Sequence, residues 1–346
     1  MARIVGKYFF WPLIVTITGL IAIFCIGWQS YGTLSGAGSF FLIGAVLAAL
    51  EISLSFDNAI VNANKLKYMT PVWQKRFLTW GILIAVFGMR LVFPIMIVAI
   101  AANLGPIAAV TLAIWQPGEY ARIISGSHLS IATFGGTFLM MVALTYFIDE
   151  DKEIDWFKML ERRLRQWASI RGLAIAFVLL VIVLFCMFIP VGDRATFLLS
   201  AVLGLLTFLL VELLGNVLDR AEEARDVARA GGLGAFMYLE VLDASFSFDG
   251  VIAAFAFTKN LFLIAIGLGI GAMYVRSMTI MLVEKKTLAQ FRYLEHGAFY
   301  SIFILSAIMF AQSMIHIPEV ITGLLGVGLI GLALLASLRY NRKNPA

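Results

Sequence analysis

The sequence predicts an all-α polytopic membrane protein with about ten transmembrane helices in two inverted five-helix repeats. Hydrophobic residues make up 61% of the 346 residues and charged residues only 14%, too little polar surface for a soluble domain of this size. Apolar runs close to the roughly 20 residues that cross a bilayer recur along the whole chain. An acidic motif also occurs twice, once in each half of the sequence.

Ten segments have the length and composition expected of a membrane span. The first follows a short basic stretch, but its apolar run is too long for a secretion signal, so we expect it to be retained. The stretch 104–130 holds an apolar run too short to cross the bilayer, and we expect it to be re-entrant or interfacial. The expected spans are 8–30, 38–62, 76–103, 131–148, 171–190, 195–218, 232–258, 261–284, 296–316 and 319–338.

The distribution of basic residues gives the expected orientation. With ten spans, 21 of the 26 lysines and arginines fall on the side that holds both termini. An eleventh span would destroy this asymmetry, so the positive-inside rule places both termini in the cytoplasm. The net charge of +5 therefore follows membrane topology, and we expect no nucleic-acid partner. The expected location is the cytoplasmic (inner) membrane of a bacterium, with the lipid bilayer as the surrounding partner.

The position of the two motifs defines the repeat. One lies in the second span and the other in the seventh, so each repeat holds five spans, and an odd number inverts one half relative to the other. We expect residues 1–190 to form the first repeat and 191–346 the second, within a single integrated membrane domain. Glycine clusters at 267–271 and 323–331 are typical of close helix packing in membranes.

The repeated motif carries the chemistry. Glu51-Ile-Ser-Leu-Ser-Phe-Asp57-Asn58 returns as Asp243-Ala-Ser-Phe-Ser-Phe-Asp249-Gly250. Ionisable groups at bilayer depth cost roughly 2.5–3.5 kcal/mol each even on the most lenient scale. Retaining them in both halves indicates a function, and a cation site between the two repeats is the natural one.

The candidate ligands offer only oxygen atoms. Carboxylate, amide and hydroxyl oxygens suit Mn²⁺, Ca²⁺ and Mg²⁺ rather than Zn²⁺ or Cu⁺. We expect no tightly bound cofactor, because the cation would be cargo. The predicted metal-binding residues are Glu51, Ser55, Asp57, Asn58, Glu240, Asp243, Ser247 and Asp249.

The spacing within the motif constrains the backbone. Glu51 and Asp57 are six residues apart, about 240° around an ideal helix, so a straight helix cannot point both at one ion. Either they line different sides of a pathway or the helix is interrupted between them. Ser, Asp, Asn and Gly compete with helical hydrogen bonding, which makes an interruption plausible in both copies.

A purely structural alternative pairs these acids with Arg90 and Arg276, the two arginines within spans. Two arginines do not neutralise the whole acidic set. Protonation would neutralise part of the remainder, as it would in an exchanger that uses protons as the counter-ion.

The two motifs resemble those of the TerC/Alx family of integral membrane proteins. They resemble more closely a bacterial branch classed as a domain of unknown function within the LysE-type transporter superfamily. The resemblance covers about residues 38–316 and implies manganese efflux across the cytoplasmic membrane, with a historical link to tellurite resistance. It also implies that Glu51, Asp57, Asn58, Asp243 and Asp249 coordinate the metal. Ten spans exceed the count usual in that family, and Gly250 replaces the Asn58 of the first motif.

The leading hypothesis is a secondary transporter, not an enzyme, that exports a divalent cation, with Mn²⁺ as the first candidate. Export of a cationic organic solute such as a basic amino acid is the alternative within the same superfamily. An intramembrane aspartyl protease would need Asp57 and Asp249 to share a proton, and the Gly-x-Gly-Asp context of such proteases is missing. A non-transporting membrane scaffold or sensor is the remaining alternative.

Overall fold

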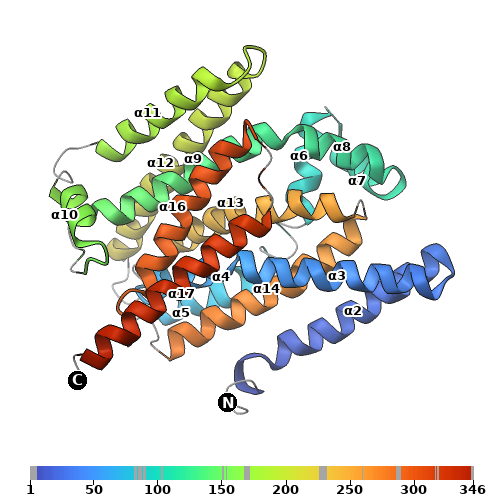
Figure 1. Ribbon diagram of the computed structural model, residues 1–346, viewed down its shortest axis with the longest axis horizontal. Helices are drawn as coiled ribbons and strands as arrows, with labels where there is room; N and C mark the ends of the chain where they lie inside the picture. The colour runs from blue at the N-terminus through green and yellow to red at the C-terminus, as the bar shows by residue number, and fades with distance from the viewer. Residues whose placement is uncertain are drawn as a thin grey trace.

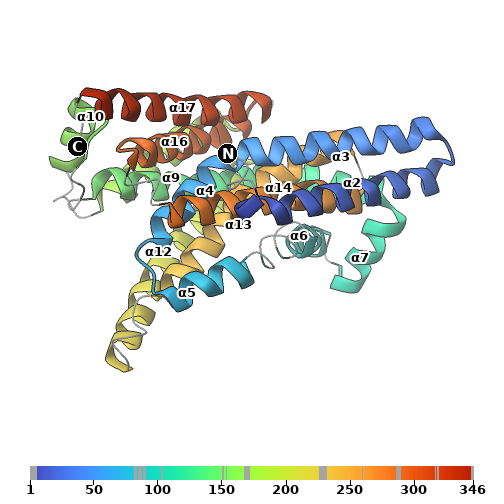
Figure 2. The ribbon, with the colours of Figure 1, turned by 90° about the horizontal axis from the view of Figure 1, so that it is seen from below.

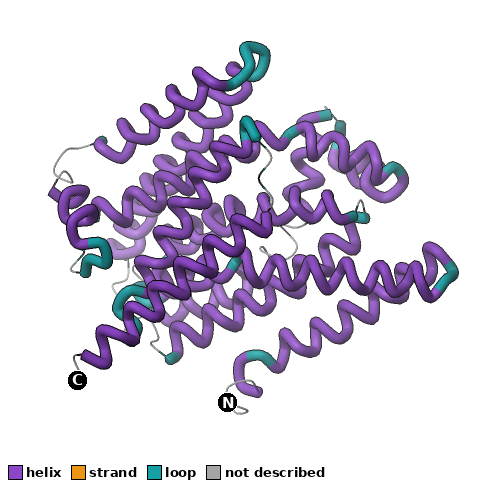
Figure 3. Tube along the Cα trace, in the orientation of Figure 1, coloured by secondary structure: helices purple, strands orange, loops and turns teal. Residues whose placement is uncertain are grey.

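The computed structural model describes residues 6–81, 84, 88, 91–102, 104–149, 152, 154–166, 172–225, 232–258, 260–285, 290–315, 317 and 319–343. These residues form helices joined by short loops and contain no strand (Figure 3), which confirms the all-α class. The helices are α2 Phe10–Tyr31, α3 Leu34–Leu54, α4 Phe56–Leu66, α5 Pro71–Arg76, the π-helix η1 Phe77–Gly81, α6 Phe93–Ala101, α7 Pro106–Trp115, α8 Pro117–Gly126, α9 His128–Ile148, α10 Lys158–Gln166, α11 Leu173–Phe188, α12 Arg194–Arg225, α13 Leu233–Phe257, α14 Leu261–Glu284, α16 Leu294–Gln312 and α17 Glu319–Lys343.

Seven helices in the described part of the chain are long and apolar enough to cross a membrane: α2, α3, α9, α12, α14, α16 and α17. Each coincides with one of the ten expected spans. Among the other three, α11 has 16 residues and a length of about 24 Å, less than the hydrocarbon core of a typical bilayer. The expected span 76–103 is divided among the end of α5, η1 and α6.

The stretch 104–130 forms two short helices, α7 and α8, and the start of α9. A proline opens each short helix, at Pro106 and Pro117, where the missing backbone N–H leaves no intrahelical bond unmade. Each helix has 10 residues, about 15 Å at 1.5 Å per residue. Neither is long enough to cross a bilayer alone.

The outer helices carry apolar side chains on the surface. On α2, Trp11, Ile17 and Trp28 are exposed. Large apolar side chains are also exposed on α11, α12 and α17. Such a surface is unfavourable in water and favourable in lipid. In both ribbon views α2 and α3 form a hairpin that extends from the body of the molecule (Figures 1 and 2). The described chain therefore has the features of an integral membrane protein.

The centre of the molecule is built on α9 and α16, which pack against each other. Helix α12 also packs on α9, and α17 packs on α16. Small residues allow these close approaches. A Cβ added to Gly204 would lie 2.4 Å from the backbone oxygen of Phe134, and one on Gly297 would lie 2.5 Å from Cβ of Ala333.

The expected glycine surface at 267–271 is confirmed where α14 crosses α3. A Cβ on Gly267 would lie 2.9 Å from Cβ of Leu47, and one on Gly271 would lie 2.4 Å from the side chain of Glu51. The cluster 323–331 is less uniform. Gly326 approaches Ser301, whereas Gly328 and Gly331 have open space beside them.

A buried ion-pair cluster fixes the segment between α9 and α11 to the rest of the bundle. Lys152 Nζ lies 2.6 Å from Glu161 of α10, and both side chains are buried. The other carboxylate oxygen, Oε1, accepts hydrogen bonds from the backbone N–H groups of Trp156 and Phe157 and from the Tyr300 hydroxyl of α16. The Glu161 carboxylate therefore links α10, its preceding loop and α16.

His296 of α16 completes this cluster. Its Nε2 lies 2.8 Å from the backbone oxygen of Ile154 and 3.4 Å from the Glu161 carboxylate. Burial acts to raise the pKa of Glu161, but hydrogen bonds to His296, Lys152 and the Phe157 N–H outweigh it and lower the pKa from 4.5 to about 2. The carboxylate is therefore ionised in the folded protein across the physiological range.

We expect Glu161→Gln to lower the stability of the folded protein by about 3 kcal/mol at neutral pH, because it removes the buried carboxylate that pairs with Lys152 at 2.6 Å. The depressed folded-state pKa gives Glu161 a stabilising effect that is complete above its usual pKa of 4.5 and declines as the pH falls toward 2. Unfolding midpoints in detergent should therefore differ most between native and variant at pH 7.

The matched control is Glu119→Gln, which breaks the exposed pair between Glu119 and Arg122. Exposed ion pairs contribute little, so its midpoint should follow that of the native protein at every pH. A difference between native and Glu161→Gln that stayed constant down to pH 3 would contradict the assignment.

Candidate functional site

The first acidic motif lies at a helix interruption. Helix α3 ends at Leu54, Ser55 has φ −101° and ψ 15°, and α4 begins at Phe56. The predicted break between Glu51 and Asp57 is therefore confirmed in this copy. Asp57 occupies the first turn of α4, and its Oδ1 accepts a hydrogen bond from the Asn58 N–H, a favourable place for a carboxylate.

The second motif keeps its helix. Helix α13 runs without interruption from Leu233 to Phe257, so the expected break in this copy is wrong. Without a break, Glu240 and Asp243 remain three residues apart on one helix face. The two halves of the site thus differ in backbone as well as in sequence.

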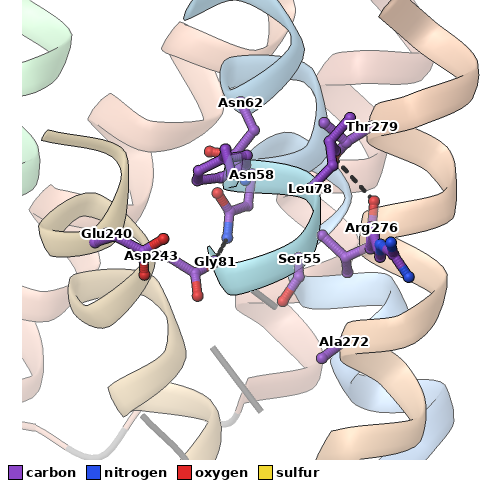
Figure 4. A pocket seen from close by; sticks show the side chains of 12 residues that line it. Ser55, Asn58, Asn62, Leu78, Gly81, Glu240, Asp243, Ala272, Arg276 and Thr279 are labelled. Carbon is purple, nitrogen blue, oxygen red and sulfur yellow. Dashed lines mark hydrogen bonds between the residues drawn. The ribbon is translucent and has the colours of Figure 1, made fainter. Parts of the chain in front are cut away.

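The two motifs enclose a small cavity of about 40 Å³. In Figure 4 the carboxylates of Glu240 and Asp243 on α13 lie on one side of the cavity and helix α14 lies on the other. Residues of the first motif lie between them. The π-helix η1 completes the wall, where a Cβ on Gly81 would lie 2.7 Å from Glu240 Oε1. The lining residues are Ser55, Asn58, Asn62, Phe77, Leu78, Gly81, Glu240, Asp243, Ala272, Val275, Arg276 and Thr279.

One hydrogen bond joins the two motifs directly. Asn58 Nδ2 donates to Asp243 Oδ1 at 2.5 Å, which leaves the amide oxygen of Asn58 available as an acceptor. Within the described residues, no donor reaches three buried oxygens on this wall: Asn58 Oδ1, Asn62 Oδ1 and Glu240 Oε1. A buried acceptor without a donor costs about 1–3 kcal/mol. A cation bound in the cavity is one occupant that would give such oxygens a partner.

Glu51 does not line the cavity itself but contacts Ser55, a residue of the wall. Its carboxylate accepts a hydrogen bond of 3.0 Å from Ser55 Oγ, and Ser55 lines the cavity. The side chain is buried and packs on Gly271 of α14. Glu51 therefore positions Ser55, and only Ser55 reaches the cavity.

Asp57 is directed elsewhere. Its Oδ2 accepts a hydrogen bond of 2.9 Å from Ser301 of α16, while Oδ1 bonds the Asn58 N–H. Asp57 is buried but does not line the cavity. The sequence analysis missed Ser301, because a single serine in an apolar span is an ordinary packing residue.

Two predicted ligands lie outside the part of the chain whose side chains are described. These are Ser247 and Asp249, on the unbroken backbone of α13. Arg90, one partner in the structural alternative, is also outside the described residues. Arg276 lines the cavity, but within the described residues no carboxylate lies within ion-pair distance of it and its buried Nε has no acceptor.

The donor set determines what the cavity can hold. The described residues contain no group of three or more His, Cys, Asp and Glu side chains placed to bind a metal. The wall instead offers two carboxylates, two amide oxygens and two hydroxyl groups, together with the guanidinium of Arg276. Hard cations accept such mixed oxygen ligands and retain some water. The residues therefore fit a Mg²⁺-, Ca²⁺- or Mn²⁺-like ion.

A comparison with models of known protein families identifies the family of this chain. A family model described as "Protein of unknown function (DUF475)" matches residues 56–344. The chain belongs to the DUF475 family. The match begins at Phe56, so α2, α3 and Glu51 precede it, while α4, α13 and α14 lie within it. No curated protein and no solved structure matches this DUF475 chain.

We expect Gly271→Ala to perturb the site without touching the cavity wall. The added methyl group would lie 2.4 Å from Cβ and Cγ of Glu51, so α14 or Glu51 must shift and Ser55 loses its acceptor. Overpacking of this kind costs about 1–3 kcal/mol, measurable as a lower unfolding midpoint.

Gly38→Ala on α3 is the control, because nothing lies within 4 Å of an added Cβ there. An alanine within a helix should stabilise it by about 0.5–1 kcal/mol relative to glycine. Equal midpoints for the two variants would show that α3 and α14 do not meet as described.

Proposed function

We propose that this DUF475 protein is a secondary transporter that exports a divalent metal cation, with Mn²⁺ as the first candidate and Ca²⁺ or Mg²⁺ as alternatives. One observation carries the proposal. Three buried oxygens without donors, on Asn58, Asn62 and Glu240, border one cavity together with Asp243. Such a wall disfavours the empty state and favours an occupant that accepts oxygen ligands on several sides.

The size of the cavity favours an ion over an organic cation. At about 40 Å³ it is close to the roughly 30 Å³ that one water molecule occupies in the liquid. Pockets for small organic ligands are about 300–1,000 Å³. A basic amino acid would need a much wider cavity.

The arrangement of helices supports the two inverted repeats. Helix α4 of the first half packs on α16, and α13 of the second half packs on α9, the corresponding pair. The contact of α2 with α3 is matched in the same way by that of α12 with α13. In Figure 1, α2 begins and α17 ends toward the same side of the molecule, as expected if both termini are cytoplasmic.

The proposed transport cycle uses the contact between the halves. Asn58 from the first repeat and Asp243 from the second share a hydrogen bond, so a cation held there bridges two bodies that can rock against each other. Movement of α13 relative to α4 would open the cavity to one side and then the other. Protons are the proposed counter-ion, and the resemblance to TerC/Alx proteins and the LysE-type superfamily supports this class.

The protease alternative finds less support. It requires Asp57 to face a second aspartate across a shared proton. Both carboxylate oxygens of Asp57 are instead occupied by donors, the Asn58 N–H and the Ser301 hydroxyl.

Transport in proteoliposomes tests the proposal. We expect the native protein to carry Mn²⁺, with Ca²⁺ and Mg²⁺ compared in parallel. Asp243→Asn and Glu240→Gln should each lower kcat/KM at least tenfold, equivalent to about 1.4 kcal/mol. Asp193→Asn, at an exposed carboxylate near the start of α12, is the matched control and should transport as the native protein does.

Absence of flux for all three ions, with folded native protein, would overturn the exporter proposal. Flux of lysine or another organic cation under the same conditions would favour the solute-export alternative. Inactivity toward both classes would favour a scaffold or sensor.

A second experiment separates the roles of the two aspartates. Because Asp57 bonds Ser301 and the Asn58 backbone rather than facing the cavity, we expect Asp57→Asn to change Mn²⁺ affinity only a few-fold. Asp243→Asn should weaken it more than tenfold. Equilibrium Mn²⁺ binding followed by electron paramagnetic resonance measures both, and equal losses would make Asp57 a direct ligand.

A further inference from the structure

A second and much larger cavity lies beside the Glu161 cluster. Its volume is about 690 Å³, within the range of sites for organic or phosphorylated ligands. It shares no lining residue with the small cavity. Its wall comes from the end of α4, from α9 and α13, and from the segment around the start of α16 and the end of α17.

Among the described residues, the ionised groups on this wall are mainly cationic. Lys65, Lys67, Lys152 and Arg292 face two carboxylates, Asp149 and Glu295. Two of the cations already have partners: Lys67 pairs with Glu295 at 3.3 Å, and Lys152 pairs with Glu161 at 2.6 Å. Glu150, Asp151 and Glu153 are outside the described residues.

Lys65 and Arg292 remain without an ion-pair partner among the described residues. Lys65 Nζ lies 5.0 Å from the centre of the Tyr238 ring, with no described carboxylate within 4 Å. The Arg292 guanidinium lies 4.8 Å from the centre of the Tyr340 ring, and its Nη1 donates a long hydrogen bond of 3.4 Å to the Tyr340 hydroxyl. Its Nε is buried and has no acceptor in the described part of the chain.

These features define an anion site. Contact with Tyr340 holds the guanidinium in place, which reduces the entropy lost when it binds a ligand. An arginine fork combined with a lysine is the usual recognition of phosphate oxygens. Tyrosine hydroxyls and the amides of Gln290 and Asn341 on the same wall supply further donors. A divalent cation would meet two unpaired positive charges here.

We propose that this cavity binds a phosphate group through Lys65 and Arg292. The group could belong to a soluble phosphate or to the headgroup of an anionic phospholipid. The lining includes the helix ends that the sequence analysis assigns to the cytoplasm, and basic pockets between helices on that side suit lipid phosphates. The proposal does not depend on the transport function of the small cavity.

Thermal unfolding of the full chain tests this site. The purified protein is titrated in nonionic detergent with inorganic phosphate, and separately with anionic phosphatidylglycerol, with zwitterionic phosphatidylcholine, of zero net charge, as the comparison. We expect a saturable rise in the midpoint with one of the two anionic probes. A response to phosphatidylglycerol alone identifies a lipid source, and a response to inorganic phosphate identifies a soluble one.

Variants connect the response to the cavity. Arg292→Gln and Lys65→Gln should each weaken the apparent affinity at least fivefold, while Arg339→Gln, at an exposed arginine of α17 outside the wall, should not. Two variants are used so that poor folding of one leaves the other informative. Absence of a saturable shift with either probe, or an equal shift in native protein and both variants, would overturn the proposal. A shift with Mn²⁺ that is lost in Glu295→Gln but kept in Asp243→Asn would also overturn it, because the cavity would then hold a cation.

Discussion

The interruption of the helix at Ser55 is the feature on which the rest of the site depends. A straight helix from Leu34 to Leu66 would point Glu51 and Asp57 to different sides, about 240° apart around the helix axis. Helix α4 begins at this break, and Asn58 near its start donates a hydrogen bond to Asp243 of α13. Breaks in membrane helices persist only where the freed polar groups find partners. Here the hydroxyl of Ser55 bonds Glu51, and Asp57 bonds the Asn58 N–H at the new N-terminus.

Close packing of α3 on α14 holds this interruption in place. Gly267 and Gly271 bring the α14 backbone against Leu47 and Glu51, and the Glu51 carboxylate accepts the hydrogen bond from Ser55. The same approach brings Arg276 and Thr279 of α14 to the cavity wall. On the other side, Ser301 connects Asp57 to α16. The site is therefore supported by α3, α4, α14 and α16, which come from both halves of the sequence.

The sequence predicted which residues could act as oxygen ligands better than it predicted which way each side chain faces. Repetition of the acidic motif identified α3, α4 and α13, and four of the predicted ligands, Ser55, Asn58, Glu240 and Asp243, do line one cavity. Rotation of each helix was harder to predict, because spans that are apolar on every side carry no stripe that marks the inward face. Asp57 was for this reason expected at the centre, whereas it faces Ser301. Asn62, Thr279 and Ser301 were missed because small polar residues are common in membrane spans for packing alone.

Helix α4 shows how stability and function can coincide. It is only 11 residues long, with Asp57 in its first turn and Lys65 in its last. Each charge lies at the end where the helix dipole favours it, so the short helix is stabilised at both termini. Asn58 and Asn62 of this helix line the small cavity, and Asn64 and Lys65 near its C-terminus line the large one. One short helix can therefore border both the proposed cation cavity and the proposed anion cavity. The charges of Asp57 and Lys65 at its two ends are each favourable to the helix dipole.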